Sequence, residues 1–204
     1  MKNLEIEVKF FVINPDSMRR RILKLGAEHL GRFFESNLRF EDKNKTLLKN
    51  KSLLRLRKDN KATLTFKSPP PLDNHNFKIL TELEVQVSDF ATMGLILQAL
   101  GFHPEQRYEK WRETFVLGKT HFCLDTMPFG NFIEIEGQKR SIRDSATRLG
   151  LKWENRILLN YLQLFDILRQ KLNLAFHDVT FKNFEGLEVN VSTYADLFIA
   201  APRP

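Results

Sequence analysis

The stretch Glu5-Ile6-Glu7-Val8-Lys9 decides how this chain folds. Its apolar and charged side chains alternate strictly along the backbone. Because successive side chains of a β-strand point to opposite faces of a sheet, the alternation predicts a strand with one apolar and one charged face. A single strand of this kind normally turns its charged face to water, but here the same pattern returns along the chain.

Eight segments show the strand pattern, and turn, loop or helical sequences separate them. The predicted strands cover residues 4–12, 31–41, 52–58, 62–68, 79–88, 106–117, 120–126 and 131–136. Apolar residues at helical spacing predict helices over about 15–25, 89–100, 142–149 and 154–171. No glycine-rich strand–helix–strand unit occurs, so a doubly wound parallel sheet fits poorly. Eight antiparallel strands can close into a barrel without exposed edges, and we therefore expect an α+β fold built on an eight-stranded antiparallel β-barrel.

Two regions interrupt this regularity. Residues 68–76 contain three consecutive prolines and are expected to form a long loop, because proline cannot donate a strand hydrogen bond. The tail after residue 173 has one alternating piece, at 187–191. We predict a tunnel domain over 1–152 and a helical extension over 153–204 that packs on it, with capping of a tunnel mouth or a homodimer contact as alternatives.

Composition places the chain among ordinary globular proteins, with 42% hydrophobic and 28% charged residues. The net charge of +7 favours anionic partners without choosing between nucleic acid, nucleotide and membrane surface. No apolar run approaches the ~20 residues of a membrane span, and the start of the chain lacks a signal-peptide pattern. Cys123 is the only cysteine, which excludes an intrachain disulfide and a cysteine metal cage. We expect a cytoplasmic protein.

The polar faces of the predicted strands carry charges in an ordered way. Charges of one sign recur at two-residue spacing, as E-x-E, R-x-R or K-x-R, whereas a face that merely met water would show scattered signs. The acids are Glu5, Glu7, Glu82, Glu84, Asp125, Glu134 and Glu136, and the bases are Lys9, Arg55, Arg57, Lys67, Lys110 and Arg112.

Two orientations of the barrel fit this pattern. Apolar side chains could fill the barrel with the charges outside, or the charges could line a hydrated lumen with the apolar face outside. The helical stripes at 18–25, 90–100 and 157–168 favour the second orientation, because they need an apolar sheet surface to pack against. Thirteen inward charges cannot form a dry core, so such a lumen must hold water, ions and a charged ligand.

The residue types in this lumen suit phosphate chemistry. Carboxylates without histidine or cysteine are hard oxygen ligands that prefer Mg²⁺ or Mn²⁺ to zinc. Arginine and lysine bind phosphate oxygens, and six bases match a polyanion such as a triphosphate better than a single phosphate. Acids for a cation and bases for anionic oxygens together are the equipment of phosphoryl or nucleotidyl transfer.

Other chemistries fit less well. The chain has no G-x-S-x-G and no P-loop, its histidines show no metal-binding spacing, and Cys123 is best explained as a small buried thiol. A nucleic-acid module would place aromatic side chains among its bases, whereas Trp111 and Phe115 alternate away from Lys110 and Arg112. We therefore expect neither nucleic acid nor a membrane as a partner.

These motifs resemble the CYTH, or triphosphate tunnel metalloenzyme, superfamily, which includes class IV adenylate cyclases, thiamine triphosphatases and inorganic triphosphatases. The resemblance covers about residues 1–152. Its elements follow in order as Glu5-Ile6-Glu7-Val8-Lys9, Arg55-Leu56-Arg57, Lys67, Glu82-Leu83-Glu84, Lys110-Trp111-Arg112, Asp125 and Glu134-Ile135-Glu136. Within the superfamily, the segment 110–137 looks most like the class IV cyclase branch.

The resemblance implies a tunnel that holds a nucleoside triphosphate or another triphosphate together with one or two Mg²⁺ or Mn²⁺ ions. The implied triphosphate-binding residues are Lys9, Arg55, Arg57, Lys67, Lys110 and Arg112. The implied metal ligands are Glu5, Glu7, Glu82, Glu84, Asp125, Glu134 and Glu136. Lys9, Lys67 and Glu84 are the candidate catalytic residues, although neighbouring acids should raise a lysine pKa, so no general base is assigned.

Several functions stay open at this stage. A cyclase would convert ATP to cyclic AMP and pyrophosphate, and this reaction is the first expectation. A triphosphatase would hydrolyse thiamine triphosphate or inorganic triphosphate in the same cradle. A module that binds polyphosphate or nucleotide without turnover and a lipocalin-like carrier with an apolar lumen are the non-enzymatic alternatives.

Overall fold

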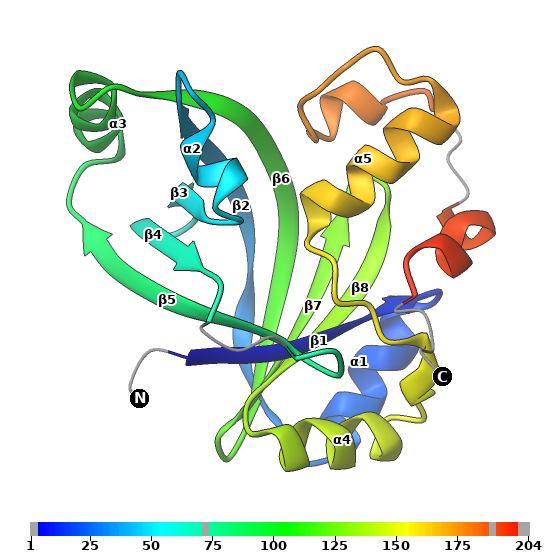
Figure 1. Ribbon diagram of the computed structural model, residues 1–204. Helices are drawn as coiled ribbons and strands as arrows, with labels where there is room; N and C mark the ends of the chain where they lie inside the picture. Colours follow the sequence, from blue (N-terminus) through cyan, green and yellow to red (C-terminus); the bar gives the residue numbers. More distant parts are fainter. Residues whose placement is uncertain (1–3, 71–73, 188–190, 200–204) are drawn as a thin grey trace.

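Eight antiparallel strands close into a barrel in the computed structural model of the chain (Figure 1). The structure describes residues 4–70, 74–187 and 191–199. The strands are β1 (Leu4–Val12), β2 (Glu28–Asp42), β3 (Leu53–Lys58), β4 (Ala62–Ser68), β5 (Lys78–Val87), β6 (Phe102–Leu117), β7 (Thr120–Met127) and β8 (Gly130–Glu136). Their order around the barrel is β1-β5-β4-β3-β2-β6-β7-β8, and β1 closes the ring by pairing with both β5 and β8. The predicted fold class is confirmed.

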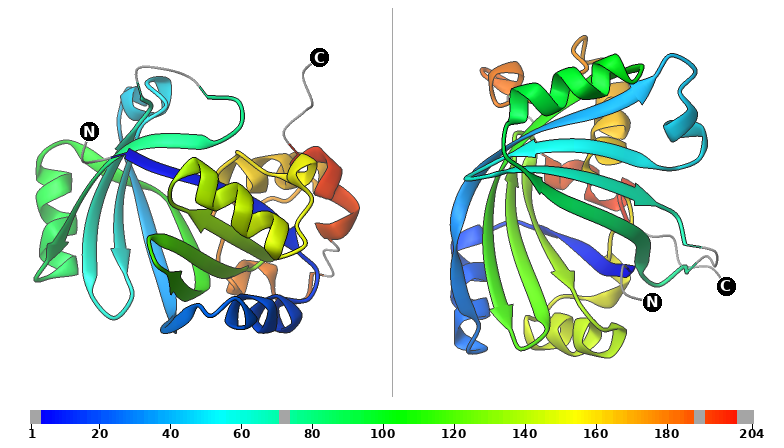
Figure 2. Two further views of the ribbon diagram at one scale, coloured as in Figure 1. Left: turned by 90° about the horizontal axis from the view of Figure 1, so that it is seen from below. Right: turned by 90° about the vertical axis from the view of Figure 1, so that its left-hand side faces the viewer.

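Helices occupy the ends and sides of this barrel (Figures 1 and 2). They are α1 (Pro15–Lys24), α2 (Thr46–Lys49), α3 (Phe90–Ala99), α4 (Lys139–Arg148) and α5 (Tyr161–Leu172), with short 3₁₀ turns η1 (Trp153–Asn155), η2 (Lys182–Phe184) and η3 (Val191–Leu197). None of the helices in the described ranges has the length and apolar character that crossing a membrane requires.

The apolar face of β1 lies outside the ring, under α1 and α4. Val8 and Phe10 are buried in one cluster with Ile22 of α1 and Ile142 of α4. The intervening Lys9 points to the other face and lines the interior cavity. The alternation in β1 therefore separates an outer hydrophobic core from a charged lumen, which is the orientation that the helical stripes predict.

On the far side of the barrel, α3 covers a second part of the outer face. Leu97 of α3 packs in one buried cluster with Phe40, Leu54 and Leu56 from β2 and β3. The Asp89 side chain caps this helix by accepting a hydrogen bond from the backbone N–H of Thr92. Leu95, on the opposite side of the helix, is 65% exposed.

Helix α5 packs differently from the helices of the outer face. Its Tyr161 and Phe165 belong to a cluster with Phe132 of β8 and Tyr108 of β6. Phe132 and Tyr108 alternate with the outward-facing residues of their strands and lie on the same face as Glu134 and Lys110. The apolar stripe at 157–168 was expected to pack on the outer face of the barrel. Instead it packs against inward-facing residues and covers one end of the tunnel (Figure 1).

The chain before and after α5 also completes the barrel wall. Ile157 exchanges two backbone hydrogen bonds with Lys9, with N···O distances of 3.1 and 2.7 Å. Val179 bonds in the same way to β6, accepting from Glu109 N–H and donating to the Arg107 carbonyl, both at 2.9 Å. These contacts satisfy polar backbone groups that the neighbouring strands leave unpaired.

Several element boundaries differ from the predicted ones. Strands β2 and β6 begin at Glu28 and Phe102, earlier than expected, because they pair with each other along most of their length. Helix α5 begins at Tyr161 instead of near 154, since Ile157 is extended against Lys9. The short α2 has no periodic pattern and depends on Glu41, whose carboxylate accepts hydrogen bonds from the first turn at 2.9 and 2.8 Å.

Two weakly patterned regions lie partly outside the described residues. Of the predicted loop at 68–76, residues 71–73 are not described, and the flanking prolines 69 and 70 line the interior cavity. The alternating piece expected at 187–191 falls mainly on residues 188–190, which are also not described.

The orientation of α3 predicts a sharp contrast between two leucines on the same helix. We expect Leu97→Ala to lower the free energy of unfolding by about 2–5 kcal/mol, because it opens a cavity above β3. Leu95→Ala, the matched control at an exposed position, should change it by less than ~0.5 kcal/mol. Urea denaturation of both variants measures the difference, and equal losses would contradict the outer position of the core.

Candidate functional site

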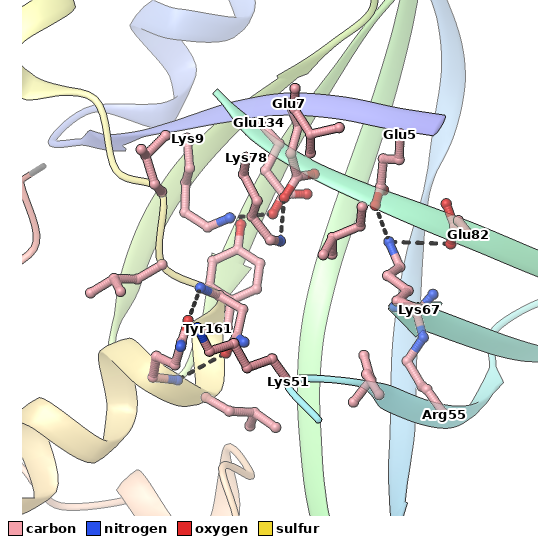
Figure 3. A pocket seen from close by; sticks show the side chains of 18 of the residues that line it. Glu5, Glu7, Lys9, Lys51, Arg55, Lys67, Lys78, Glu82, Glu134 and Tyr161 are labelled. Atoms are coloured by element: carbon pink, nitrogen blue, oxygen red, sulfur yellow. Dashed lines mark hydrogen bonds and ion pairs between the residues drawn. The ribbon is translucent and has the colours of Figure 1, made fainter. Parts of the chain in front are cut away.

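A cavity of about 840 Å³ occupies the interior of the barrel and brings the predicted charges together (Figure 3). Twelve of the thirteen predicted site residues line it: Glu5, Glu7, Lys9, Arg55, Arg57, Lys67, Glu82, Glu84, Lys110, Arg112, Glu134 and Glu136. Asp125, the remaining one, is fully buried and bonds to the bases of β6 from behind. Residues from strands far apart in sequence thus share one charged chamber.

Strand β1 supplies three of these groups, each with a partner of opposite charge. The Lys67 ammonium lies 2.5 Å from a Glu5 oxygen and 3.2 Å from Glu82. The Lys78 ammonium lies 2.5 Å from Glu7, and the Lys9 ammonium lies 2.5 Å from Glu134. Figure 3 shows these pairs in contact along the inner wall of the chamber.

The basic strand β6 is held against β7 and β8. Arg112 donates to both Asp125 oxygens, at 2.7 and 2.5 Å, and also pairs with Glu134. Lys110 donates to Asp125 at 3.0 Å. This bidentate arrangement fixes the guanidinium plane. Asp125 therefore orients two bases in this structure, and its predicted role as a metal ligand stays a prediction.

The arginines of β3 form a looser group. Arg55 and Arg57 lie 3.8 and 3.7 Å from opposite oxygens of Glu84. Arg55 also donates to the Thr65 hydroxyl at 3.1 Å. The Glu84 side chain is 37% exposed, the most accessible acid of these ion pairs, so incoming anionic oxygens can replace it at low cost.

The ion pairs keep the buried acids charged. Burial alone would raise the pKa of Glu7, but the ammonium groups of Lys78, Lys9 and Lys67 together outweigh this effect and lower it to about 2. Glu35 is likewise buried, yet Lys110 and Arg112 lower its pKa to about 2. Burial would lower the pKa of Lys78, and the Glu7 carboxylate raises it instead. At neutral pH the chamber thus contains fixed charges of both signs.

Two acids of the chamber do not follow this pattern. Burial and the Glu7 carboxylate raise the pKa of Glu5. Glu136 has no ion pair within 4 Å among the described side chains, and burial together with the nearby Glu5 and Glu7 carboxylates raises its pKa to about 7. No three acidic, histidine or cysteine groups of the described chain lie in an arrangement that already forms a metal site. The carboxylates of Glu5, Glu7 and Glu136 nevertheless suit a hard divalent cation, whose charge would relieve the repulsion among them.

The structure adds cavity residues that the sequence prediction did not collect. Lys78 shares the inward face of β5 with Glu82, but the predicted strand began one residue too late to include it. Arg39 lies on the polar face of β2, and the alternation of polar and apolar residues along this strand could have identified it. Lys51 follows α2 with φ of 52° and Tyr161 opens α5, and no strand pattern marks either one.

Two alternative chemistries fit the chamber poorly. Burial raises the pKa of the Cys123 thiol to about 12, so it stays protonated and is a poor nucleophile. The charged lining also contradicts a lipocalin-like carrier, which would need an apolar interior.

Fold and cavity together define the class of protein. It is a closed β-tunnel with opposed acids and bases in its bore. The profile of the CYTH domain matches residues 3–159, and the chain belongs to the CYTH domain family.

Solved structures share this fold. The PH1012 protein of Pyrococcus horikoshii is 33% identical with a TM-score of 0.67, over 78% of this chain and 98% of that one. A Vibrio parahaemolyticus protein described as a candidate adenylate cyclase is 19% identical, with a TM-score of 0.72 over 81% and 99% of the two chains. The candidate adenylyl cyclase HpAC1 of Hippeastrum, with a dominant triphosphatase activity, is 19% identical, with a TM-score of 0.57 over 80% and 95%. The last two show the fold alone, and no curated protein sequence matches the chain.

The raised pKa of Glu136 predicts a pH-dependent effect on stability. Between pH 4.5 and 7 the folded protein keeps a proton that the unfolded chain has lost, so Glu136 makes folding less favourable as the pH rises. We expect Glu136→Gln to stabilise the metal-free protein at pH 8 by about 1–3 kcal/mol. The difference should disappear towards pH 4.5.

Urea unfolding in the presence of a chelator at several pH values measures this difference. Glu154→Gln removes an exposed carboxylate and is the matched control. A stabilisation that is the same at pH 5 and pH 8 would contradict the repulsion among the three carboxylates.

Proposed function

We propose that the protein is a metal-dependent enzyme that cleaves a triphosphate-bearing substrate inside the tunnel. The observation that carries this proposal is the convergence of six predicted bases from β1, β3, β4 and β6 on the cavity that also holds the acids of β1, β5 and β8. A pure anion-binding site would gain nothing from so many acids. Acids and bases in one chamber suit an anion that arrives with a cation.

The bases are proposed to bind the phosphate chain. Arg55 and Arg57 would bind oxygens at one side of the chamber, where Glu84 is their replaceable partner. Lys110 and Arg112, oriented by Asp125, would bind oxygens at the other side. Lys9 and Lys67 are the remaining predicted phosphate ligands. The full set of predicted phosphate-binding residues is Lys9, Arg55, Arg57, Lys67, Lys110 and Arg112.

The acids are proposed to hold Mg²⁺ or Mn²⁺. Glu5, Glu7 and Glu136 form the most suitable group, because their carboxylates repel one another in the absence of a cation. The further predicted ligands are Glu82, Glu84, Asp125 and Glu134. A bound divalent ion would supply positive charge to the phosphate oxygens as the bond breaks.

The residues of the chamber are proposed to have different roles in the reaction. The bases orient the triphosphate and stabilise negative charge that develops on its oxygens, while the barrel wall excludes bulk water. Lys9, Lys67 and Glu84 are the predicted catalytic residues, and all three line the cavity. In the absence of a ligand, the Lys9 ammonium pairs with Glu134 and the Lys67 ammonium pairs with Glu5.

Two reactions are compatible with this cradle. Cyclisation of ATP, with pyrophosphate as the leaving group, is favoured by the resemblance of segment 110–137 to class IV cyclases. Hydrolysis of thiamine triphosphate or inorganic triphosphate is the alternative. The cavity of about 840 Å³ lies within the ~300–1,000 Å³ range of pockets for drug-sized organic ligands, which supports a substrate with an organic group.

Product analysis tests the proposal and separates the reactions. The protein is incubated with ATP, thiamine triphosphate or inorganic triphosphate, each with Mn²⁺, with Mg²⁺ and with a chelator. Cyclic AMP with pyrophosphate identifies a cyclase, and orthophosphate identifies a triphosphatase. Tight binding without any product would instead identify a non-catalytic polyphosphate-binding module.

Two substitutions in the chamber should reduce turnover strongly. We expect Glu134→Gln and Arg57→Ala each to lower kcat by about a hundredfold or more on the preferred substrate, because each removes one preorganised charge. Glu154→Gln and Arg140→Ala are the matched controls at exposed positions; the Arg140 side chain is 94% exposed. Near-normal turnover in folded chamber variants would count against the proposed function.

A further inference from the structure

Tyr161, the first residue of α5, reaches from the C-terminal segment into the charged chamber. The residue is only 7% exposed, and its ring lines the cavity. Its hydroxyl donates to Asp125 at 2.7 Å, and its ring packs edge-on against Phe132 at 5.3 Å. Tyr161 lies just beyond residues 3–159, the part of the chain that the CYTH profile matches.

Two lysines of the proposed phosphate cradle lie over this ring. The Lys9 ammonium is 4.2 Å and the Lys110 ammonium 5.1 Å from the ring centroid. Both lysines are 2% exposed. An ammonium at these distances is attracted to the negative face of an aromatic ring, most strongly where water is excluded. Figure 3 shows Lys9 and Tyr161 beside each other in the chamber.

A ring holds an ammonium group in a way that a carboxylate does not. A carboxylate accepts N–H groups, and it competes with an incoming phosphate for them. The ring face attracts the charge without accepting a full hydrogen bond, so the N–H groups of Lys9 and Lys110 that do not bond Glu134 or Asp125 stay available to phosphate oxygens. The rigid ring also excludes water from the back of both lysines, which strengthens their electrostatic effect.

The position of Tyr161 is fixed by its own segment. A capping box begins α5: Asn160 accepts from Gln163 N–H and Gln163 accepts from Asn160 N–H, both at 2.9 Å. Four residues before Tyr161, Ile157 exchanges backbone hydrogen bonds with Lys9. The same short segment thus fixes the backbone of Lys9 and places a ring beside its side chain.

We propose that Tyr161 is a positioning residue of the triphosphate site, holding Lys9 and Lys110 ready for phosphate while its hydroxyl steadies Asp125 behind them. The C-terminal extension then completes the site, and does more than cover the barrel. This inference rests on the proposed function, because it assigns both lysines to the phosphate chain.

Binding of inorganic tripolyphosphate, measured by calorimetry without metal and again with Mg²⁺, tests the inference on four folded proteins. They are the wild type, Tyr161→Leu, Tyr161→Phe and Phe165→Leu. The last one is the matched control, since Phe165 is a fully buried ring one turn along α5 that contacts Phe129 and Phe176.

We expect Tyr161→Leu to raise Kd for tripolyphosphate about tenfold or more, which corresponds to the loss of two cation–π contacts. Tyr161→Phe keeps the ring and should recover most of the lost affinity. Phe165→Leu should lower the Tm but leave Kd within about threefold of the wild type. If Tyr161→Leu does not fold, Tyr161→Met provides the same comparison with a longer apolar side chain.

The outcomes separate this inference from the proposed function. Wild-type affinity in Tyr161→Leu, or equal losses in Tyr161→Leu and Phe165→Leu, would overturn the positioning role alone. Failure of Tyr161→Phe to recover affinity would overturn the part assigned to the ring. Absence of tripolyphosphate binding by the wild type would overturn the proposed function and this inference together.

Discussion

The structure depends on keeping many ionised side chains inside a closed ring of strands. A charge removed from water without a partner is prohibitively unfavourable, so every buried acid needs a base, a cation or water beside it. Ring closure supplies such partners, because it brings the acids of β1, β5, β7 and β8 opposite bases from other strands. The pair between Lys9 and Glu134 joins residues 125 positions apart in sequence.

This constraint explains why the main hydrophobic core lies outside the ring. With the lumen occupied by charges and water, the apolar faces of the strands have to be covered from the other side, and α1, α3 and α4 do so. The same constraint suits the proposed function. The acids and bases of the chamber now pair with each other. If a triphosphate entered with a divalent cation, the bases would bind the phosphate oxygens and the acids would bind the cation.

The C-terminal segment provides partners for buried polar and aromatic groups at one end of the tunnel. Strands β1 and β5 pair only over the first residues of β1, which leaves the backbone of Lys9 without a strand partner on that side. Ile157 provides the missing hydrogen bonds, and α5 then covers inward-facing aromatic residues such as Phe132. The predicted boundary at residue 152 stays a prediction, and the family match extends beyond it to residue 159.

The sequence by itself determined the strands and the face of each strand on which the charged side chains lie. These features depend on two-residue periodicity, which is local, so Glu5, Glu7 and Lys9 could be assigned to one face without coordinates. The apolar stripes of the helices indicated that the apolar face of the sheet lies outside, since amphipathic helices need an apolar surface to pack against. Lys78 was within reach of the same reasoning and was missed only through a strand boundary.

Only the tertiary structure decided which charges meet. The pairing of Lys78 with Glu7, the lack of an ion pair for Glu136 among the described side chains and the burial of Asp125 behind Arg112 follow from the register of neighbouring strands. The role proposed for Tyr161 depends on where α5 is docked. No periodic signal encodes such contacts, because they join segments whose separation in the chain bears no relation to their separation in space.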